Sequence, residues 1–166
     1  TQIIALPMVP KNVAEEITGA KSYFDYKERC VFCDMLRQEM QEKERVVLEN
    51  KYFLAFCPFV SRFPFEIWIM PKKHNAYLRS ISDDEIHFLG EILKDTIAKV
   101  KNIFPNLSYN YILHVAPING DTDVEYYHWH IEFMPKLTQV AGFEWGTGFY
   151  IDPITPEQAA KYLKGG

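Results

Sequence analysis

Residues 127–133 read Tyr-His-Trp-His-Ile-Glu-Phe, and this stretch decides the fold. Side chains on a β-strand point alternately to its two faces. The polar residues that share one face are His128, His130 and Glu132. The apolar residues on the opposite face are Trp129, Ile131 and Phe133. The alternation predicts a strand whose apolar face is buried in a core and whose polar face carries a functional site.

The composition indicates one folded domain over residues 1–166. A chain of 166 residues with 48% hydrophobic content is large enough to bury a core of its own. The net charge of −4 and the lack of a Lys/Arg block argue against a nucleic-acid partner. The longest apolar runs are of strand length and no signal peptide is evident, so we expect no membrane span. Together with three cysteines, these features predict a cytoplasmic protein.

The order of the predicted elements indicates an α+β fold. Short β-prone runs between turn residues predict strands at residues 46–49, 52–57, 65–70 and 109–115. The sequence Ser-Asp-Asp-Glu at residues 82–85 is a capping box that opens a long helix. Its apolar stripe at helical spacing comprises Ile86, Leu89, Leu93, Ile97, Val100 and Phe104. Thr155 followed by Pro156 predicts a short final helix, whereas residues 11–27 show no clear pattern.

A pair of cysteines, Cys30 and Cys33, has the C-x2-C spacing of a zinc knuckle. Two thiolates at this spacing can hold one zinc ion, and they need two further ligands to complete a tetrahedron. His74 and His128 are the best candidates, and a closed set of this kind would be structural. A redox pair is the alternative, although no βαβ context surrounds the motif. Cys57 stands alone in a predicted strand, where a buried apolar role is expected.

Other polar residues have two readings each. His87 is expected on the solvated side of the long helix. His114 is either a structural histidine of the sheet with its hydrogen bonds satisfied or a member of the His128–His130 site. The second holds if its strand pairs with residues 127–133. Glu132 is expected as a salt-bridge partner, and Glu16 as part of a solvated face.

A glycine-rich segment, Ala-Gly-Phe-Glu-Trp-Gly-Thr-Gly-Phe at residues 141–149, carries one carboxylate, Glu144. Glycines permit close approach of the backbone to a ligand, while aromatic rings and a carboxylate suit sugar faces and hydroxyls. The alternative is a turn-rich connection without a ligand.

Taken together, these motifs resemble the galactose-1-phosphate uridylyltransferase family of the histidine-triad superfamily. More narrowly, they look like the C-terminal half of its zinc-binding branch, which includes ADP-sugar phosphorylase relatives. The resemblance covers nearly the whole chain, and it implies a histidine-triad-like antiparallel sheet with flanking helices. The motifs that carry it are TQIIALP at residues 1–7, CVFC at 30–33, PFEIWIMP at 64–71, HWH at 128–130 and AGFEWGTG at 141–148.

Members of this family consist of two similar halves, and the catalytic His-Pro-His-x-Gln motif closes the first half. Thr1 and Gln2 look like the last two positions of that motif, so Gln2 would steady the nucleotide-linked phosphate. The nucleophilic histidine would then lie immediately upstream, outside this chain. The chain also opens on Thr1 and an apolar run, so we expect it to be a piece of a longer polypeptide. The resemblance implies two protein partners, the upstream half and a second copy in a homodimer.

The resemblance implies metal and sugar ligands as well. The zinc-binding branch implies a Zn²⁺ site made by Cys30, Cys33, His74 and His128. Members without the paired cysteines hold a metal through one Glu and three His, at positions that match Glu16, His114, His128 and His130. Both sets need His128, so only one of them can form, and the presence of the two cysteines favours the Cys30–Cys33–His74–His128 set. The sequence leaves open whether the metal is zinc or iron. The family's sugar contacts map onto Gly142, Phe143, Glu144 and Gly146.

The implied chemistry is nucleotidyl transfer by double displacement, as in galactose metabolism. An imidazole attacks the α-phosphorus of a nucleoside-diphosphate sugar and releases a sugar 1-phosphate; an acceptor then takes the nucleotide. This chain has Trp129 where the catalytic motif has Pro, and Glu132 where it has Gln. A carboxylate beside a transferring phosphate is repulsive unless it is neutralised. His130 therefore looks like the non-catalytic residue that occupies, in the second half, the position of the nucleophile.

Three hypotheses follow. The favoured one is the metal-stabilised, sugar-binding half of a hexose-1-phosphate uridylyltransferase. The second is an autonomous histidine-triad nucleotide hydrolase or transferase with His130 as nucleophile, against which the missing third triad histidine counts. The third is a zinc-stabilised module without activity. Uridylyl or adenylyl transfer, and phosphate or hexose 1-phosphate as acceptor, stay open.

Overall fold

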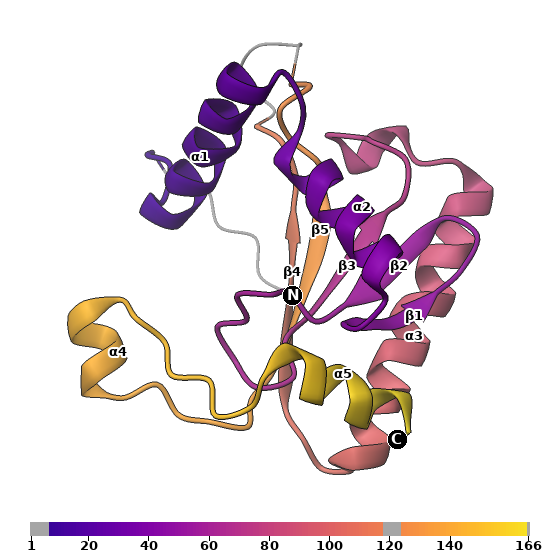
Figure 1. Ribbon diagram of the computed structural model, residues 1–166, viewed down its shortest axis with the longest axis vertical. Helices are drawn as coiled ribbons and strands as arrows, with labels where there is room; N and C mark the ends of the chain where they lie inside the picture. The colour runs from indigo at the N-terminus through magenta and orange to yellow at the C-terminus, as the bar shows by residue number, and fades with distance from the viewer. Residues whose placement is uncertain (1–6, 118–123, 166) are drawn as a thin grey trace.

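One five-stranded antiparallel sheet, in the order β1-β2-β3-β5-β4, organises the molecule (Figure 1). The computed structural model describes residues 7–117 and 124–165. The strands are β1 (Val46–Glu49), β2 (Phe53–Phe56), β3 (Ile67–Pro71), β4 (Tyr109–His114) and β5 (His130–Pro135). The helices are α1 (Lys11–Lys27), α2 (Val31–Glu42), the 3₁₀ turn η1 (Leu78–Ser80), α3 (Asp83–Ile103), α4 (Gly142–Thr147) and α5 (Pro156–Lys164). The α+β expectation is confirmed.

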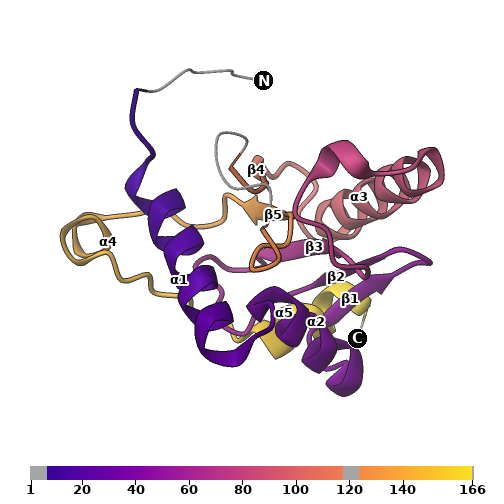
Figure 2. The same ribbon diagram turned by 90° about the horizontal axis from the view of Figure 1, so that it is seen from above.

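Both faces of the sheet are covered by helices (Figures 1 and 2). On one face, residues of α3 and α5 pack with the apolar row predicted from residues 127–133. That row is Trp129, Ile131 and Phe133, all 6% exposed or less. On the other face, residues of α1 and α2 pack against Leu54, Phe56 and Met70. The polar row of the same stretch therefore lies beneath α1 and α2.

The ladder of β5 begins at His130, so residues 127–129 approach it as irregular backbone rather than as the predicted strand. The alternation nevertheless holds, because the Trp129 N–H donates to the Asn75 carbonyl and fixes the approach. His130 lies opposite His114 of β4, and Glu132 lies opposite both Trp68 of β3 and Ile112 of β4. This register brings histidines from two strands side by side.

The long helix begins as predicted. The Ser82 side chain accepts the Glu85 N–H, and the Glu85 carboxylate accepts the Ser82 N–H, which completes the capping box of α3. Most of the predicted stripe packs on the core. Ile86 does not, since 53% of it is exposed, and Ile92 and Thr96 are buried instead. Within the described residues, the helices are too short or too polar to cross a membrane.

Two segments are helical where the sequence predicts no helix. Residues 11–27 form α1, and the glycine-rich segment at residues 141–149 contains α4. The Ala141 N–H donates to the Glu144 carboxylate at the start of α4, and Gly148 ends the helix at a φ of 76°. Local hydrogen bonds thus convert a glycine-rich stretch into a short helix. α4 stands away from the sheet, and its Trp145 is 80% exposed (Figures 1 and 2).

Candidate functional site

Four potential metal ligands converge beside the sheet from separate parts of the chain. Cys30 caps α2 and Cys33 lies in its first turn. His74 follows β3, and His128 precedes β5. One ligand atom from each of the four lies within 4.8 Å of all the others. The structure therefore brings together the complete set expected from the C-x2-C motif.

The geometry of this Cys2His2 group fits a tetrahedral metal ion. The Cys33 Sγ lies 3.1 Å from the His74 Nδ1 and 3.4 Å from the His128 Nδ1. Zinc bonds of about 2.0–2.3 Å give ligand–ligand edges of about 3.5 Å, close to these separations. Hydrogen bonds from Cys33 and the two histidines lower the pKa of Cys30 well below its ordinary value. The donor set favours Zn²⁺, which prefers thiolate and imidazole ligands.

A second group lies next to the first and contains Glu16, His114 and His130. The His114 Nδ1 is 2.9 Å from the Glu16 Oε2, and the His130 Nε2 is 4.0 Å from the Glu16 Oε1. Tyr127 donates its hydroxyl hydrogen to the same carboxylate. The two ligand sets, which the sequence presents as alternatives sharing His128, are thus two neighbouring groups. His128 belongs with the cysteines.

Carboxylates set the charge of His114. Burial alone would lower its pKa, but Glu132 and Glu16 raise it to about 9. Burial would raise the pKa of Glu132, yet His114 and Arg62 lower it to about 2. Arg62 pairs with Glu132 and also lies 3.2 Å from Glu66. The expected salt-bridge role of Glu132 is confirmed, and Arg62 is its partner.

His130 is enclosed by other rings. It stacks on His114 with centroids 4.7 Å apart and on Trp68 with centroids 4.8 Å apart. Its Nδ1–H donates to the His128 carbonyl, which leaves the Nε2 as the free acceptor. Burial and the charge of His114 lower the pKa of His130 to about 4. His130 is thus a neutral, fully buried imidazole flanked by carboxylates.

The glycine-rich segment lies apart from both groups and borders a depression of about 280 Å³. Arg62 and Glu144 both line it, together with the aromatic residues Phe63 and Tyr150. Their rings meet edge to face with centroids 5.1 Å apart. A cation, a carboxylate and two rings in one depression are the groups that a sugar phosphate would contact.

The remaining expectations have mixed outcomes. His87 is on the exposed side of α3, and Cys57 is fully buried, both as expected. Glu16 is not part of a solvated face, because α1 carries it onto His114. Gln2 lies outside the described residues. Arg62 is not among the residues predicted from the sequence, and its partner in the site, Glu132, lies 70 positions away in the chain.

Comparison with known proteins agrees with this architecture. The family model described as galactose-1-phosphate uridyl transferase, C-terminal domain, matches residues 16–164. An ADP-glucose phosphorylase of Arabidopsis thaliana is 36% identical over 99% of this chain and 46% of its own length. A galactose-1-phosphate uridylyltransferase of Thermotoga maritima is 35% identical over 98% of this chain and 53% of its own length. The chain therefore spans about half the length of these curated relatives.

Solved structures extend the comparison. The Arabidopsis thaliana ADP-glucose phosphorylase with bound ADP-glucose superposes with a TM-score of 0.87 at 36% identity, over 98% of this chain and 51% of that one. A structure titled as a uridylyltransferase gives a TM-score of 0.88 at 32% identity, over 96% and 52%. A zinc-bound histidine-triad protein of Mycobacterium smegmatis, at 16% identity and a TM-score of 0.56 over 82% and 91%, shares the fold alone. The chain belongs to the family of galactose-1-phosphate uridyl transferase C-terminal domains.

Proposed function

We propose that this chain is the metal-stabilised, sugar-binding half of a nucleotidyltransferase of the hexose-1-phosphate uridylyltransferase type. The observation that carries the proposal is the match of the family model across residues 16–164. The complete reaction then moves a nucleoside monophosphate between sugar 1-phosphates through a nucleotidyl-histidine. The nucleophile belongs to an upstream half that ends in the motif to which Gln2 would belong.

The surroundings of His130 support an upstream nucleophile. An attacking imidazole must reach the α-phosphorus, but His130 is 0% exposed between two stacked rings. Its Nε2 points toward the Glu16 carboxylate, 4.0 Å away, and Glu132 lies on the same face of the strand. These carboxylates are paired with Arg62 and His114, so they occupy the space beside the imidazole and, among the residues that the structure describes, leave no free cation there for a phosphate. His130 is therefore a structural residue in this proposal.

Zn²⁺ in the Cys30–Cys33–His74–His128 group would tie α2 to the ends of β3 and β5. Two thiolates and two imidazoles complete a tetrahedron and leave no open position for substrate, so the metal would supply stability rather than chemistry. The free state of all three cysteines agrees with this use and with a cytoplasmic location.

The segment that holds α4 would contact the hexose. Glu144 uses one carboxylate oxygen to cap α4, and the residue lines the same depression as Arg62. A Cβ at Gly142 or Gly146 would meet no described atom within 4 Å, so packing inside the chain does not require these glycines. The need to leave space for a ligand would explain why glycine stands at these two positions. Phe143, between them, is 54% exposed and could contact that ligand.

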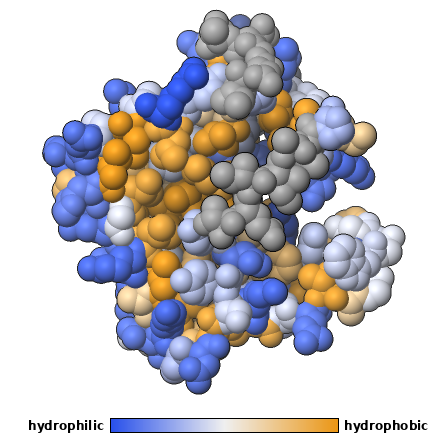
Figure 3. Space-filling model, turned by 180° about the vertical axis from the view of Figure 1, so that it is seen from behind, coloured by the Kyte–Doolittle hydropathy of each residue, from blue (hydrophilic) through white to orange (hydrophobic). Residues whose placement is uncertain are grey.

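The partners we propose are the upstream half and a second copy in a homodimer. β4 is an edge strand of the sheet, and its exposed apolar residues are Tyr111, Ile112 and Leu113. Hydrophobic side chains gather in the middle of the face seen in Figure 3. Such an edge favours pairing with another strand.

A labelling experiment tests the nucleotidyl-transfer proposal. The full-length protein is incubated with UDP-glucose labelled at the α-phosphorus, quenched, and digested. Acid-labile label on a peptide upstream of Thr1, retained in His130→Asn, is the expected result. Label on His130 itself, abolished by His130→Asn, would instead support the autonomous histidine-triad enzyme.

A second candidate, ADP-sugar phosphorylase activity, is favoured by the relative from Arabidopsis thaliana that bears that name. The same assay with labelled ADP-glucose, and with inorganic phosphate or galactose 1-phosphate as acceptor, separates the two activities. Faster turnover of ADP-glucose with phosphate would select the phosphorylase.

A further inference from the structure

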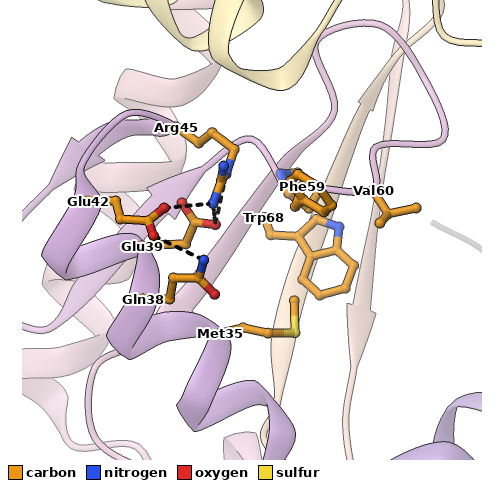
Figure 4. A pocket seen from close by; sticks show the side chains of 9 residues that line it. Met35, Gln38, Glu39, Glu42, Arg45, Phe59, Val60 and Trp68 are labelled. Carbon is orange, nitrogen blue, oxygen red and sulfur yellow. Dashed lines mark hydrogen bonds and ion pairs between the residues drawn. The ribbon is translucent and has the colours of Figure 1, made fainter.

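A cavity of about 570 Å³ lies between the C-terminal half of α2 and the turn that follows β2, and the proposed function does not use it (Figure 4). Its apolar wall consists of Met35, Pro58, Phe59, Val60 and Trp68. Phe59 and Val60 are 71% and 77% exposed, which is unusual for large apolar side chains that lie together. The volume falls within the range of about 300–1,000 Å³ that is typical of small-molecule sites.

The opposite wall is polar and carries excess negative charge (Figure 4). Arg45 is 5% exposed and donates through Nε and Nη2 to the Glu39 Oε1, at 3.0 and 2.8 Å. The same guanidinium reaches Glu42 at 3.4 Å and Glu157 at 2.9 Å. One cation therefore faces three carboxylates, and its donors are already engaged. Two of the three, Glu39 and Glu42, line the cavity together with Arg45, so the wall, as far as the structure describes it, has one carboxylate more than it has cations.

One carboxylate oxygen in this wall lacks a partner. Glu39 is only 4% exposed, and its Oε2 accepts no hydrogen bond from the part of the chain that the structure describes. A buried acceptor left without a donor costs roughly 1–3 kcal/mol. Burial accordingly raises the pKa of Glu39, although Arg45 opposes the shift. Glu39 lines the cavity, so a ligand donor that reaches this oxygen through a small shift of the wall would satisfy it.

We propose that this cavity binds a small organic cation with a planar apolar body, of the aryl-amidine or aryl-amine class. The N–H groups of the cation would donate to Glu39 and Glu42, and its ring would lie against Phe59 and Trp68. A ring with positive charge also gains attraction from aromatic faces. An anion would meet the surplus carboxylates, and a neutral apolar ligand would leave Glu39 without a donor.

This site is separate from the proposed transferase site. Trp68 lines the cavity and also stacks on His130, so its indole divides the two regions. The side chains that line the cavity include neither cysteine of the metal group nor Glu144. Occupancy is therefore measurable without any assay of transfer, and its failure would leave the metal and labelling results unchanged.

Three probes of the same shape test the proposal on the full-length protein. Benzamidine is a planar cation, benzamide its neutral counterpart and benzoate an anion. Binding is followed by titration calorimetry and by Trp fluorescence in a Trp145→Phe background, which removes an indole that is 80% exposed. We expect saturable binding of benzamidine, binding of benzamide that is at least about tenfold weaker, and no binding of benzoate; a charge-assisted hydrogen bond supports a factor of that size.

Two variants with matched controls locate the binding. Glu42→Gln removes a charge from the cavity wall at a residue whose side chain is 47% exposed, so folding should survive. Glu44→Gln is its control, because Glu44 is exposed and does not line the cavity. Phe59→Ala removes the aromatic wall, and Phe149→Ala is the control at an exposed ring elsewhere. We expect each cavity variant to weaken benzamidine by roughly tenfold and each control to leave it within about twofold.

The proposal fails if benzamidine gives no saturable signal in the full-length protein. It also fails if the three probes bind equally, or if the cavity variants behave like their controls.

Discussion

At the residue scale, histidines that are close together in the fold differ in their contacts and charge because their neighbours differ. His128 and His130 are two positions apart and share one face, yet the first lies 3.4 Å from a cysteine sulfur and the second stacks between two rings. His114 is held among carboxylates that raise its pKa to about 9, whereas burial and His114 lower the pKa of His130 to about 4. Local environment, rather than residue type, therefore decides which imidazole can serve as a metal ligand.

Cys30→Ser is the sharpest test of the metal group. A Ser hydroxyl is a poor zinc ligand, so metal content should fall from about one ion per chain toward zero. The thermal midpoint should fall as well, because metal binding contributes folding free energy. Elemental analysis and thermal unfolding check both outcomes.

The matched control is Cys57→Ala, which changes a fully buried cysteine outside the metal group. It should lower stability through the lost packing and keep the metal. A stable, metal-free wild-type protein, or a Cys30–Cys33 disulfide, would contradict the zinc site.

At the element scale, the helices α3 and α4 differ in capping and in how much of each is packed against the sheet. α3 has a complete capping box and a long apolar face, so it forms the main cover of one side of the sheet. α4 has six residues, none of them buried, and it stands clear of the sheet. A helix with so little packing is held by its caps and is free to present side chains to a ligand or partner.

Ser82→Ala removes the cap of α3. The Glu85 N–H loses its acceptor, so the free energy of unfolding should decrease by about 1 kcal/mol. Denaturant unfolding measures the change. Ser22→Ala, at an exposed position within α1, is the control and should cost nothing, since Ala is the better helix former. Equal effects of the two changes would argue against the capping role.

Glu144→Ala tests the sugar-binding role of the α4 segment in the full-length enzyme. Loss of a charge-assisted hydrogen bond of roughly 1.5–3 kcal/mol should weaken the use of sugar 1-phosphate by about ten- to a hundredfold. Steady-state kinetics at varied sugar 1-phosphate measure the effect, and metal content should not change.

Glu15→Ala, at an exposed position of α1, is the control for a lost surface charge. If Glu144→Ala and Glu15→Ala both leave the kinetic constants unaltered, α4 has no part in sugar binding.

At the scale of the whole molecule, the chain has a complete sheet but an incomplete active site under the proposed function. Both groups of potential metal ligands lie on the α1 and α2 side, while the edge strand β4 leaves apolar residues exposed. In that proposal, the core and the metal supply stability and the upstream half supplies the nucleophile.

The 166-residue chain by itself should therefore be a poor catalyst. Incubation with labelled UDP-glucose or ADP-glucose should leave no acid-labile label on it, because the only imidazole at the matching position, His130, is buried among carboxylates. The full-length protein, treated in parallel, is the positive control. Stoichiometric labelling of the isolated chain would contradict the proposal that the nucleophile lies in the upstream half.

The features that depend on neighbouring residues follow from the amino-acid sequence alone. Alternation at residues 127–133 predicted which side chains enter the core, Ser82 and Glu85 predicted the start of α3, and the C-x2-C spacing predicted a paired thiolate site. These succeed because strand periodicity, helix capping and a tight knuckle are properties of a few consecutive residues. The family assignment, which rested on the order of such motifs, is likewise confirmed.

The combinations of groups that are distant in the chain depend on the folded arrangement of the whole domain. Glu16 and His114 are 98 positions apart, and Arg62 and Glu132 are 70 apart, so no local pattern could pair them. Their pairing depends on where α1 packs relative to the end of β4 and on the register of β5, both of which long-range packing sets. The sequence presents two alternative ligand sets that share His128, whereas the structure contains two separate groups. This difference also comes from long-range packing, because strand register and helix packing fix which side chains are neighbours in space.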